Sequence, residues 1–178
     1  KMVAAAKLKK NQDRILALRP YANKLHNLLA EVRASLEDEA ENVLMSSRDP
    51  RKVLIILVTS NRGLCGGFNA NAIHKAMEVA EETYAQQWKS GDVSFYAIGK
   101  KGADFLRSNK LPLAGIETKI FDQLGFQNTT LLAEQFTLDF ISGKYDRIDF
   151  VYNRFKNAAV QIVAHESFLP VQVEDQEY

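Results

Sequence analysis

The chain has 178 residues, of which 46% are hydrophobic, and this is enough for one ordinary globular domain together with an appendage. Its 23 basic and 22 acidic residues leave a net charge of +1, so the chain as a whole has no bias toward nucleic acid or another polyanion. The single cysteine excludes an internal disulfide, and no apolar run approaches the roughly 20 residues of a membrane-spanning helix.

Residues 1–46 have the pattern of one long helix that contains no glycine. Apolar side chains recur with the seven-residue spacing of a coiled coil, and we call this set the seam: Leu8, Ile15, Leu18, Leu25, Leu29, Val32 and Leu36. Pro20 lies away from the seam, where it should bend the helix. About 45 residues with a rise of 1.5 Å each would extend roughly 70 Å, which exceeds the width of a domain of this size. We therefore predict half of a coiled-coil shaft, rather than an amphipathic helix packed on its own domain.

The same helix carries most of the charge asymmetry of the chain. Between Lys1 and Arg33 there are eight basic and two acidic residues, a net charge of 8 − 2 = +6. A basic helix can bind nucleic acid, but this one lacks recognition motifs and a run of interleaved aromatic residues. We therefore predict a protein partner with an acidic surface, and no nucleic acid.

The segment 51–170 alternates strand and helix patterns and predicts a sheet domain. Its apolar run at 53–58 is typical of a strand buried on both faces. We expect further strands at 93–98, 116–121, 148–152 and 160–168, the last of them antiparallel, and helices at 70–90, 102–108 and from Asn128 or Thr129 to Gly143. The last helix should turn four side chains inward: Leu131, Leu132, Phe136 and Phe140. The predicted fold class is α/β, a mostly parallel, Rossmann-like three-layer sheet domain with a long N-terminal coiled-coil helix and an acidic tail at 171–178.

A glycine-rich turn follows the first strand: Arg62, Gly63, Leu64, Cys65, Gly66, Gly67, Phe68 and Asn69. Open α/β sheets bind ligands at this end of a central strand. A phosphate-binding P-loop, however, requires Gly-Lys-Ser/Thr, whereas Phe68 and Asn69 follow Gly67 here. The spacing Gly-x-x-Gly-Gly also misses the dinucleotide fingerprint Gly-x-Gly-x-x-Gly. We predict no cofactor at this turn and expect Arg62 and Asn69 to hold it, with Asn69 capping the next helix.

The reactive side chains predict neither catalysis nor metal binding. No histidine stands near Cys65 in the sequence, and we expect this residue to be a small buried thiol. The three histidines, His26, His74 and His165, are far apart, which argues against a metal site. The alternative is a flavodoxin-like or nucleotide-binding enzyme that uses the turn at 63–67, which binding of ATP, NADPH or FMN there would support.

Four segments resemble the gamma subunit of F-type ATP synthases. The turn Ser60–Asn69 is similar to the signature turn of that family, which usually carries aspartate where Asn61 stands. The segments Lys1–Leu8, Arg19–Ala22 and Val151–Asn157 are also similar to segments of the family. All four follow one another in the family's order, so the resemblance covers nearly the whole chain.

The resemblance implies a non-catalytic rotor subunit, the central stalk that couples transmembrane ion flow mechanically to ATP synthesis in the catalytic hexamer. The implied partners are the catalytic alpha and beta subunits, the epsilon subunit and the membrane rotor ring, with no small-molecule substrate. Candidate contacts with the catalytic subunits are Lys1, Met2, Lys7, Lys9 and Lys10. The family pairs its first helix with a long C-terminal helix, so we expect this chain to be a segment that lacks that helix. The implied location is peripheral, at the cytoplasmic face of a bacterial inner membrane or its organellar equivalent.

Overall fold

The computed structural model describes residues 2–35, 43–46, 48–122, 125–157 and 160–172. Within the first helix, the side chains of residues 2–5, 7, 21, 26–27 and 29–35 lie outside this description. The expected contact residue Lys1, the seam residue Leu36 and the acidic tail from residue 173 onward also lie outside the described residues. The chain divides into two compact units, residues 1–42 with 172–178 and residues 43–171.

The first unit contains one long helix, α1 (Met2–Ser35), with Pro20 inside it. Its 34 residues, at a rise of 1.5 Å each, make a helix about 51 Å long. Helix was predicted up to Ser46, but residues 43–45 form a turn. The reason is that Leu44 belongs to the second unit: it packs against an apolar cluster there, and its carbonyl accepts a hydrogen bond from the N–H of Val171 (2.8 Å).

The second unit is built on a five-stranded sheet with the order β3-β2-β1-β4-β5. The strands are β1 (Val53–Val58), β2 (Val93–Ile98), β3 (Leu113–Glu117), β4 (Arg147–Phe155) and β5 (Gln161–Leu169). Neighbouring strands pair in parallel except β4 and β5, which are antiparallel as predicted. The central strand is β1, and its first five residues are buried.

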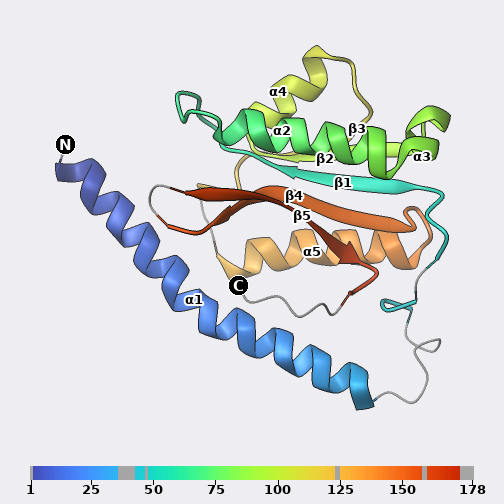
Figure 1. Ribbon diagram of the computed structural model, residues 1–178, viewed down its shortest axis with the longest axis horizontal. Helices are drawn as coiled ribbons and strands as arrows, with labels where there is room; N and C mark the ends of the chain where they lie inside the picture. Colours follow the sequence, from blue (N-terminus) through green and yellow to red (C-terminus); the bar gives the residue numbers. More distant parts are fainter. Residues whose placement is uncertain (1, 36–42, 47, 123–124, 158–159, 173–178) are drawn as a thin grey trace. The chain divides into compact units, whose positions relative to one another are not determined.

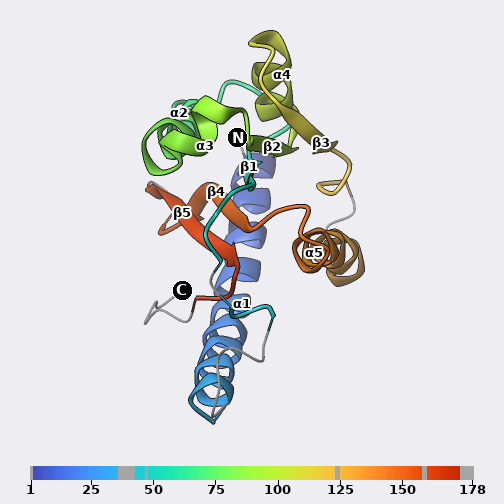
Figure 2. The same ribbon diagram turned by 90° about the vertical axis from the view of Figure 1, so that its right-hand side faces the viewer.

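Helices cover both faces of this sheet. They are α2 (Phe68–Glu78), the π-helix η2 (Val79–Thr83), α3 (Ala85–Ser90), α4 (Lys100–Ser108) and α5 (Phe126–Ile141). Figure 1 shows α2, α3 and α4 on one side of the sheet and α5 on the other, and Figure 2 shows the same separation from the end. The predicted mostly parallel, three-layer α/β fold is therefore confirmed.

The apolar core forms two layers, one on each face of the sheet. Alternate residues of a strand point to opposite faces, so β1 contributes to both layers. Val53, Ile55 and Leu57 belong to the layer beneath α2 and α4, whereas Leu54 and Ile56 belong to the layer that contains Phe136 and Phe140 of α5. This arrangement explains why the sequence of β1 is apolar throughout.

The third strand differs from its prediction, because β3 covers Leu113–Glu117 and not 116–121. The strand ends at Glu117, whose Oε1 accepts hydrogen bonds from the N–H groups of Lys119 (2.6 Å) and Ile120 (3.0 Å). These bonds close a turn over residues that were expected to continue the strand.

The last helix also begins earlier than predicted. The residue before α5 is Gly125, and no side chain caps the helix; Thr129 Oγ1 instead donates to the carbonyl of Phe126 inside the first turn (2.9 Å). Phe136 and Phe140 are buried as expected, and Leu132 packs against the same apolar layer. Leu131, however, is 66% exposed, because five helical residues place it about 140° around the axis from Phe136.

Candidate functional site at the carboxyl end of β1

The turn after β1 is held by its own hydrogen bonds. The carbonyl oxygen of Arg62 accepts bonds from Ser60 Oγ (2.6 Å) and Asn69 Nδ2 (3.1 Å). Asn69 Oδ1 accepts a further bond from the N–H of Ser60 (2.9 Å). Asn69 therefore closes the turn and does not cap α2 as predicted; the residue at the helix start is Gly67, without a side-chain cap bond. The predicted hydrogen bonds of the Arg62 guanidinium are absent among the described residues. Arg62 stabilises the turn through its backbone carbonyl, which accepts both of the bonds given above.

The residues that follow β1 also accept hydrogen bonds from the first N–H groups of α4. Three successive N–H groups of α4 donate to three successive residues that follow β1: Lys100 to Asn61 Oδ1 (2.9 Å), Lys101 to the Ser60 carbonyl (3.1 Å) and Gly102 to Thr59 Oγ1 (2.8 Å). A helix start binds phosphate through free N–H groups. Those of α4 are already used within the protein, so this helix offers no phosphate cradle.

A glycine at position 99 makes this close approach feasible. Its φ of +105° lies in the left-handed region, and a Cβ there would stand 2.1 Å from the carbonyl oxygen of Thr59. Asn61 adds a second tie, because its Nδ2 donates to the carbonyl of Thr118 beyond β3 (2.7 Å). An aspartate in place of Asn61 would have no such donor. The asparagine thus joins the ends of three neighbouring strands.

The tip of the turn is exposed. Leu64, with a φ of 60°, and Gly66, with a φ of 59°, both have left-handed backbone conformations. The side chains of Leu64 and Cys65 are exposed, so the prediction of a buried thiol at Cys65 is wrong. The loop between β1 and α2 extends beyond the end of β1 and the start of α2 (Figure 1), and residues 62–67 in it are exposed.

A cleft lies beside the turn, where the segments Ser60–Asn69 and Val151–Asn157 meet. Asn153 of β4 donates from Nδ2 to the carbonyl of Phe68 at the start of α2 (2.8 Å). The cleft has a volume of about 470 Å³. It is lined by Val58, Thr59, Ser60, Asn61, Arg62, Phe68, Phe121, Asp122, Tyr152 and Asn153. Neither the cleft nor Asn153 was predicted from the sequence.

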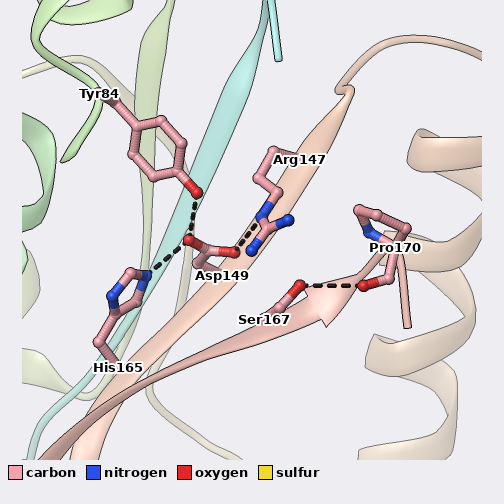
Figure 3. A network of polar contacts seen from close by, with 6 residues as sticks. All are labelled: Tyr84, Arg147, Asp149, His165, Ser167 and Pro170. Carbon is pink, nitrogen blue, oxygen red and sulfur yellow. Dashed lines mark hydrogen bonds and ion pairs between the residues drawn. The ribbon is translucent and has the colours of Figure 1, made fainter. Parts of the chain in front are cut away.

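A second polar feature, a buried carboxylate, lies within the sheet (Figure 3). Asp149 of β4 is fully buried and accepts hydrogen bonds from Arg147 Nε (2.9 Å) and Tyr84 Oη (2.5 Å). Its Oδ2 also lies 2.6 Å from His165 Nε2 of β5. Burial, followed by the charge of Asp149, raises the pKa of Tyr84 above its usual value. The four side chains form one satisfied polar cluster in an apolar layer.

Sequence reasoning missed this cluster, although one signal was present. Asp149 interrupts the apolar strand run Ile148–Val151, and a charge inside such a run requires a partner. Tyr84 reaches the carboxylate because the predicted continuous helix at 70–90 is interrupted: η2 ends there, and Tyr84 itself adopts φ −112° and ψ 38°. The cluster joins β4, β5 and the end of η2 through one buried carboxylate.

The other predicted residues lie on α1, in the first unit. Seam residues Leu8, Leu18 and Leu25 are 50%, 62% and 43% exposed, and Ile15 is half-buried. Lys9 and Lys10 are exposed, whereas the side chains of Met2, Lys7, Leu29 and Val32 lie outside the described residues. In the part of the chain that the structure describes, no group of acidic, cysteine or histidine residues could hold a metal ion. No described helix is long and apolar enough to cross a membrane.

Fold and site together define a Rossmann-like α/β domain and a long helix. In the domain, the polar groups of the turn after β1 form hydrogen bonds within the protein. A family model described as ATP synthase matches residues 1–178. The chain is 49% identical over 171 residues to the ATP synthase gamma chain of Flavobacterium johnsoniae and 43% identical over 173 residues to that of Cytophaga hutchinsonii. The chain belongs to the ATP synthase gamma-chain family, as the four similar segments indicated. The two alignments cover 96% and 97% of this chain and 58% of each relative.

Solved structures agree on the fold. One is the Tetrahymena thermophila mitochondrial ATP synthase central stalk/c-ring, with a TM-score of 0.66 and 24% identity, covering 95% of this chain and 70% of that one. Another is the rotor of the Euglena gracilis mitochondrial ATP synthase, with a TM-score of 0.52 and 18% identity, covering 94% and 60%. At these identities the likeness concerns the fold alone.

Proposed function

We propose that the protein to which this chain belongs is the central-stalk rotor subunit of an F-type ATP synthase. It would couple transmembrane ion flow mechanically to ATP synthesis in the catalytic hexamer and perform no catalysis itself. The observation that carries the proposal is the family match over residues 1–178. Because the chain spans 58% of the length of the first relatives, the role is proposed for the whole protein.

The mechanism follows from the difference between the two units. In the proposal, α1 is half of an asymmetric shaft, and a C-terminal helix of the complete protein covers its seam. The shaft contacts different neighbours at different angles and so favours different conformations of each catalytic subunit, which shifts their nucleotide affinities. The sheet domain, with its own two-layered core, is the foot of the rotor and turns together with the shaft.

The partners follow from the same proposal. The basic end of α1, with Lys1, Met2, Lys7, Lys9 and Lys10, would contact acidic surface of the alpha and beta subunits. The exposure of Lys9 and Lys10 is compatible with such a contact. The foot would face the epsilon subunit and the membrane rotor ring, which places the protein peripherally at the cytoplasmic face of a bacterial inner membrane or its organellar equivalent.

The turn after β1 has a structural role in this proposal. Its hydrogen bonds join β1, α2 and α4 and leave no phosphate cradle at the start of α4. We therefore assign the backbone of Arg62–Asn69 and the side chain of Asn69 to holding the foot together, with no catalytic role and no nucleotide cofactor.

A chimeric gamma chain tests the function. Residues 1–178 replace the matching segment of the Flavobacterium johnsoniae gamma chain in the complete ATP synthase, and ion-driven ATP synthesis is measured in membrane vesicles. We expect the chimera to assemble and to synthesise ATP at a rate within a few-fold of the native enzyme. A matched chimera with Leu18→Lys and Leu25→Lys should lose coupling because charged groups enter the shaft. A complex that assembles with the unaltered segment but makes no ATP would contradict the proposal.

A further inference from the structure

The cleft beside the turn occupies the position in the fold where a ligand is best accommodated. The strand order changes direction at β1, with β2 and β3 on one side and β4 and β5 on the other. The connection from β1 to β2 runs over one face of the sheet, whereas α5, which leads into β4, covers the opposite face (Figure 2). In open α/β sheets, such a switch point leaves a crevice at the carboxyl ends of the strands. The cleft of about 470 Å³ lies there, within the roughly 300–1,000 Å³ range of small-molecule sites.

The walls of the cleft favour a planar apolar molecule. Three aromatic rings line it, from three separate parts of the chain: Phe68 at the start of α2, Phe121 beyond β3 and Tyr152 of β4. Phe121 is exposed, and the rings of Phe68 and Tyr152 are partly exposed. Aromatic rings bind another flat ring by offset stacking or edge contacts. The volume corresponds to one molecule of one or two fused rings.

Two polar side chains that line the cleft, Asn61 and Asn153, are already engaged. Asn61 donates to Thr118 and accepts from Lys100, and Asn153 donates to the carbonyl of Phe68. Side chains fixed in this way are preorganised and need no rearrangement when a ligand enters. They also leave few donors for a polyphosphate, in agreement with the occupied start of α4.

One cation on the wall has no side-chain partner among the described residues. Arg62 is exposed and lines the cleft, and Lys101 lies beside the next residue of the turn: its Cε atom is 3.4 Å from the position that a Cβ on Gly63 would take. Asp122 also lines the cleft and disfavours a ligand with several negative charges. A guanidinium binds a single carboxylate through two parallel hydrogen bonds.

We propose that this cleft binds a planar aromatic carboxylate, with the rings between Phe68, Phe121 and Tyr152 and the carboxylate on Arg62. The site is separate from the rotor function and does not depend on it. Occupation of the cleft holds together the ends of β1 and β4, the strands on either side of the switch point.

The probe is 2-naphthoate, titrated into the chain by isothermal calorimetry and followed by saturation-transfer NMR. Its 13 non-hydrogen atoms predict a Kd on the order of 100 µM from ordinary ligand efficiency. Arg62→Gln should weaken binding about 10-fold, because the charge-assisted bonds are lost. Arg107→Gln, at an exposed arginine on the last turn of α4, is the matched control and should change nothing.

Two further measurements separate the parts of the site. The neutral isostere 2-naphthamide should bind weakly to the unaltered chain, and Arg62→Gln should leave its affinity unchanged. Phe121→Ala, on an exposed side chain whose loss the fold tolerates, should weaken both probes; the thermal midpoint of each variant verifies folding. Three results would overturn the proposal: no saturable binding of 2-naphthoate, equal affinities in Arg62→Gln and Arg107→Gln, or tighter binding of ADP than of 2-naphthoate.

Discussion

The two units of this chain differ in how completely they bury their apolar side chains. The sheet domain buries nearly all of β1 between two apolar layers. In α1, by contrast, three described seam leucines are exposed by 43% to 62%. Since a buried leucine contributes about 1.5–3 kcal/mol relative to an exposed one, we expect the sheet domain to be stable by itself and α1 to need a partner. In the proposed rotor, α1 is the part that a partner covers, and the sheet domain is the part whose core is closed without one.

The largest expected effect concerns the seam. In the absence of another partner, the chain should self-associate through α1, and the double variant Leu18→Lys, Leu25→Lys should be monomeric. Four leucines that are each about half exposed are buried when two copies pair, which is worth about 3–6 kcal/mol, so the association constant should fall roughly 100- to 10,000-fold. Sedimentation velocity measures this. Leu16→Lys, on another side of α1, is the control and should still associate; equal behaviour of all three proteins would remove the seam from the account.

The next effect concerns the buried carboxylate. Asp149→Ala leaves Arg147 without its partner and should lower the free energy of unfolding by roughly 3–5 kcal/mol. Urea denaturation measures the loss. Glu82→Gln, at an exposed acidic residue of η2, should change the free energy by less than about 0.5 kcal/mol. If Asp149→Ala changed the free energy of unfolding as little as this control does, the stability of the sheet domain would not depend on the cluster.

A smaller loss of stability is expected from a substitution at the junction between β1 and α4. Gly99→Ala places a Cβ against the carbonyl of Thr59 and forces alanine into a left-handed conformation. Overpacking costs about 1–3 kcal/mol and the backbone about 1–2 kcal/mol, so the sum is about 2–5 kcal/mol. Gly91 has a φ of +80° with open space around it, so Gly91→Ala should cost only the backbone part. Equal melting points for the two variants would count against a tight junction.

The smallest effect is a pH dependence. The folded-state pKa of Tyr84 is raised, so its contribution is complete below the unfolded value of about 10 and declines as the pH rises above it. Tyr84→Phe should cost about 1 kcal/mol at pH 7 through the lost hydrogen bond. The difference between the two proteins should shrink above pH 10, and urea denaturation at pH 7 and at pH 10.5 measures it. If the difference in the free energy of unfolding between the two proteins increased above pH 10, this would contradict the assigned bond from Tyr84 to Asp149.

The sequence predicted elements well where a local pattern decided the structure. The continuous apolar runs of β1 and β2 gave both strands their correct bounds, because burial on both faces requires such runs. The short edge strand β3 was misplaced because its middle residue, Gly115, has no side chain to signal a strand. That glycine is required by packing: a Cβ there would lie 2.4 Å from the ring of Tyr96.

The site was less accessible to prediction because distant residues build it. The absence of a P-loop could be derived from the residues after Gly67 alone, whereas the role of Asn69 depends on the path of the backbone at Ser60 and Arg62. The bond between Tyr84 and Asp149 spans 65 positions in the sequence. Interactions of this length follow from the topology of the sheet, and no local pattern encodes them.

Hydrogen exchange of the two units tests the central claim most directly. The rates of amide exchange are measured by mass spectrometry in the dilute, monomeric Leu18→Lys, Leu25→Lys chain and in the complete ATP synthase that carries the unaltered sequence. The account predicts strong protection of β1 in both samples, and protection of α1 in the assembled complex only. Strong protection of α1 in the isolated monomer would contradict it, since the helix would then need no partner.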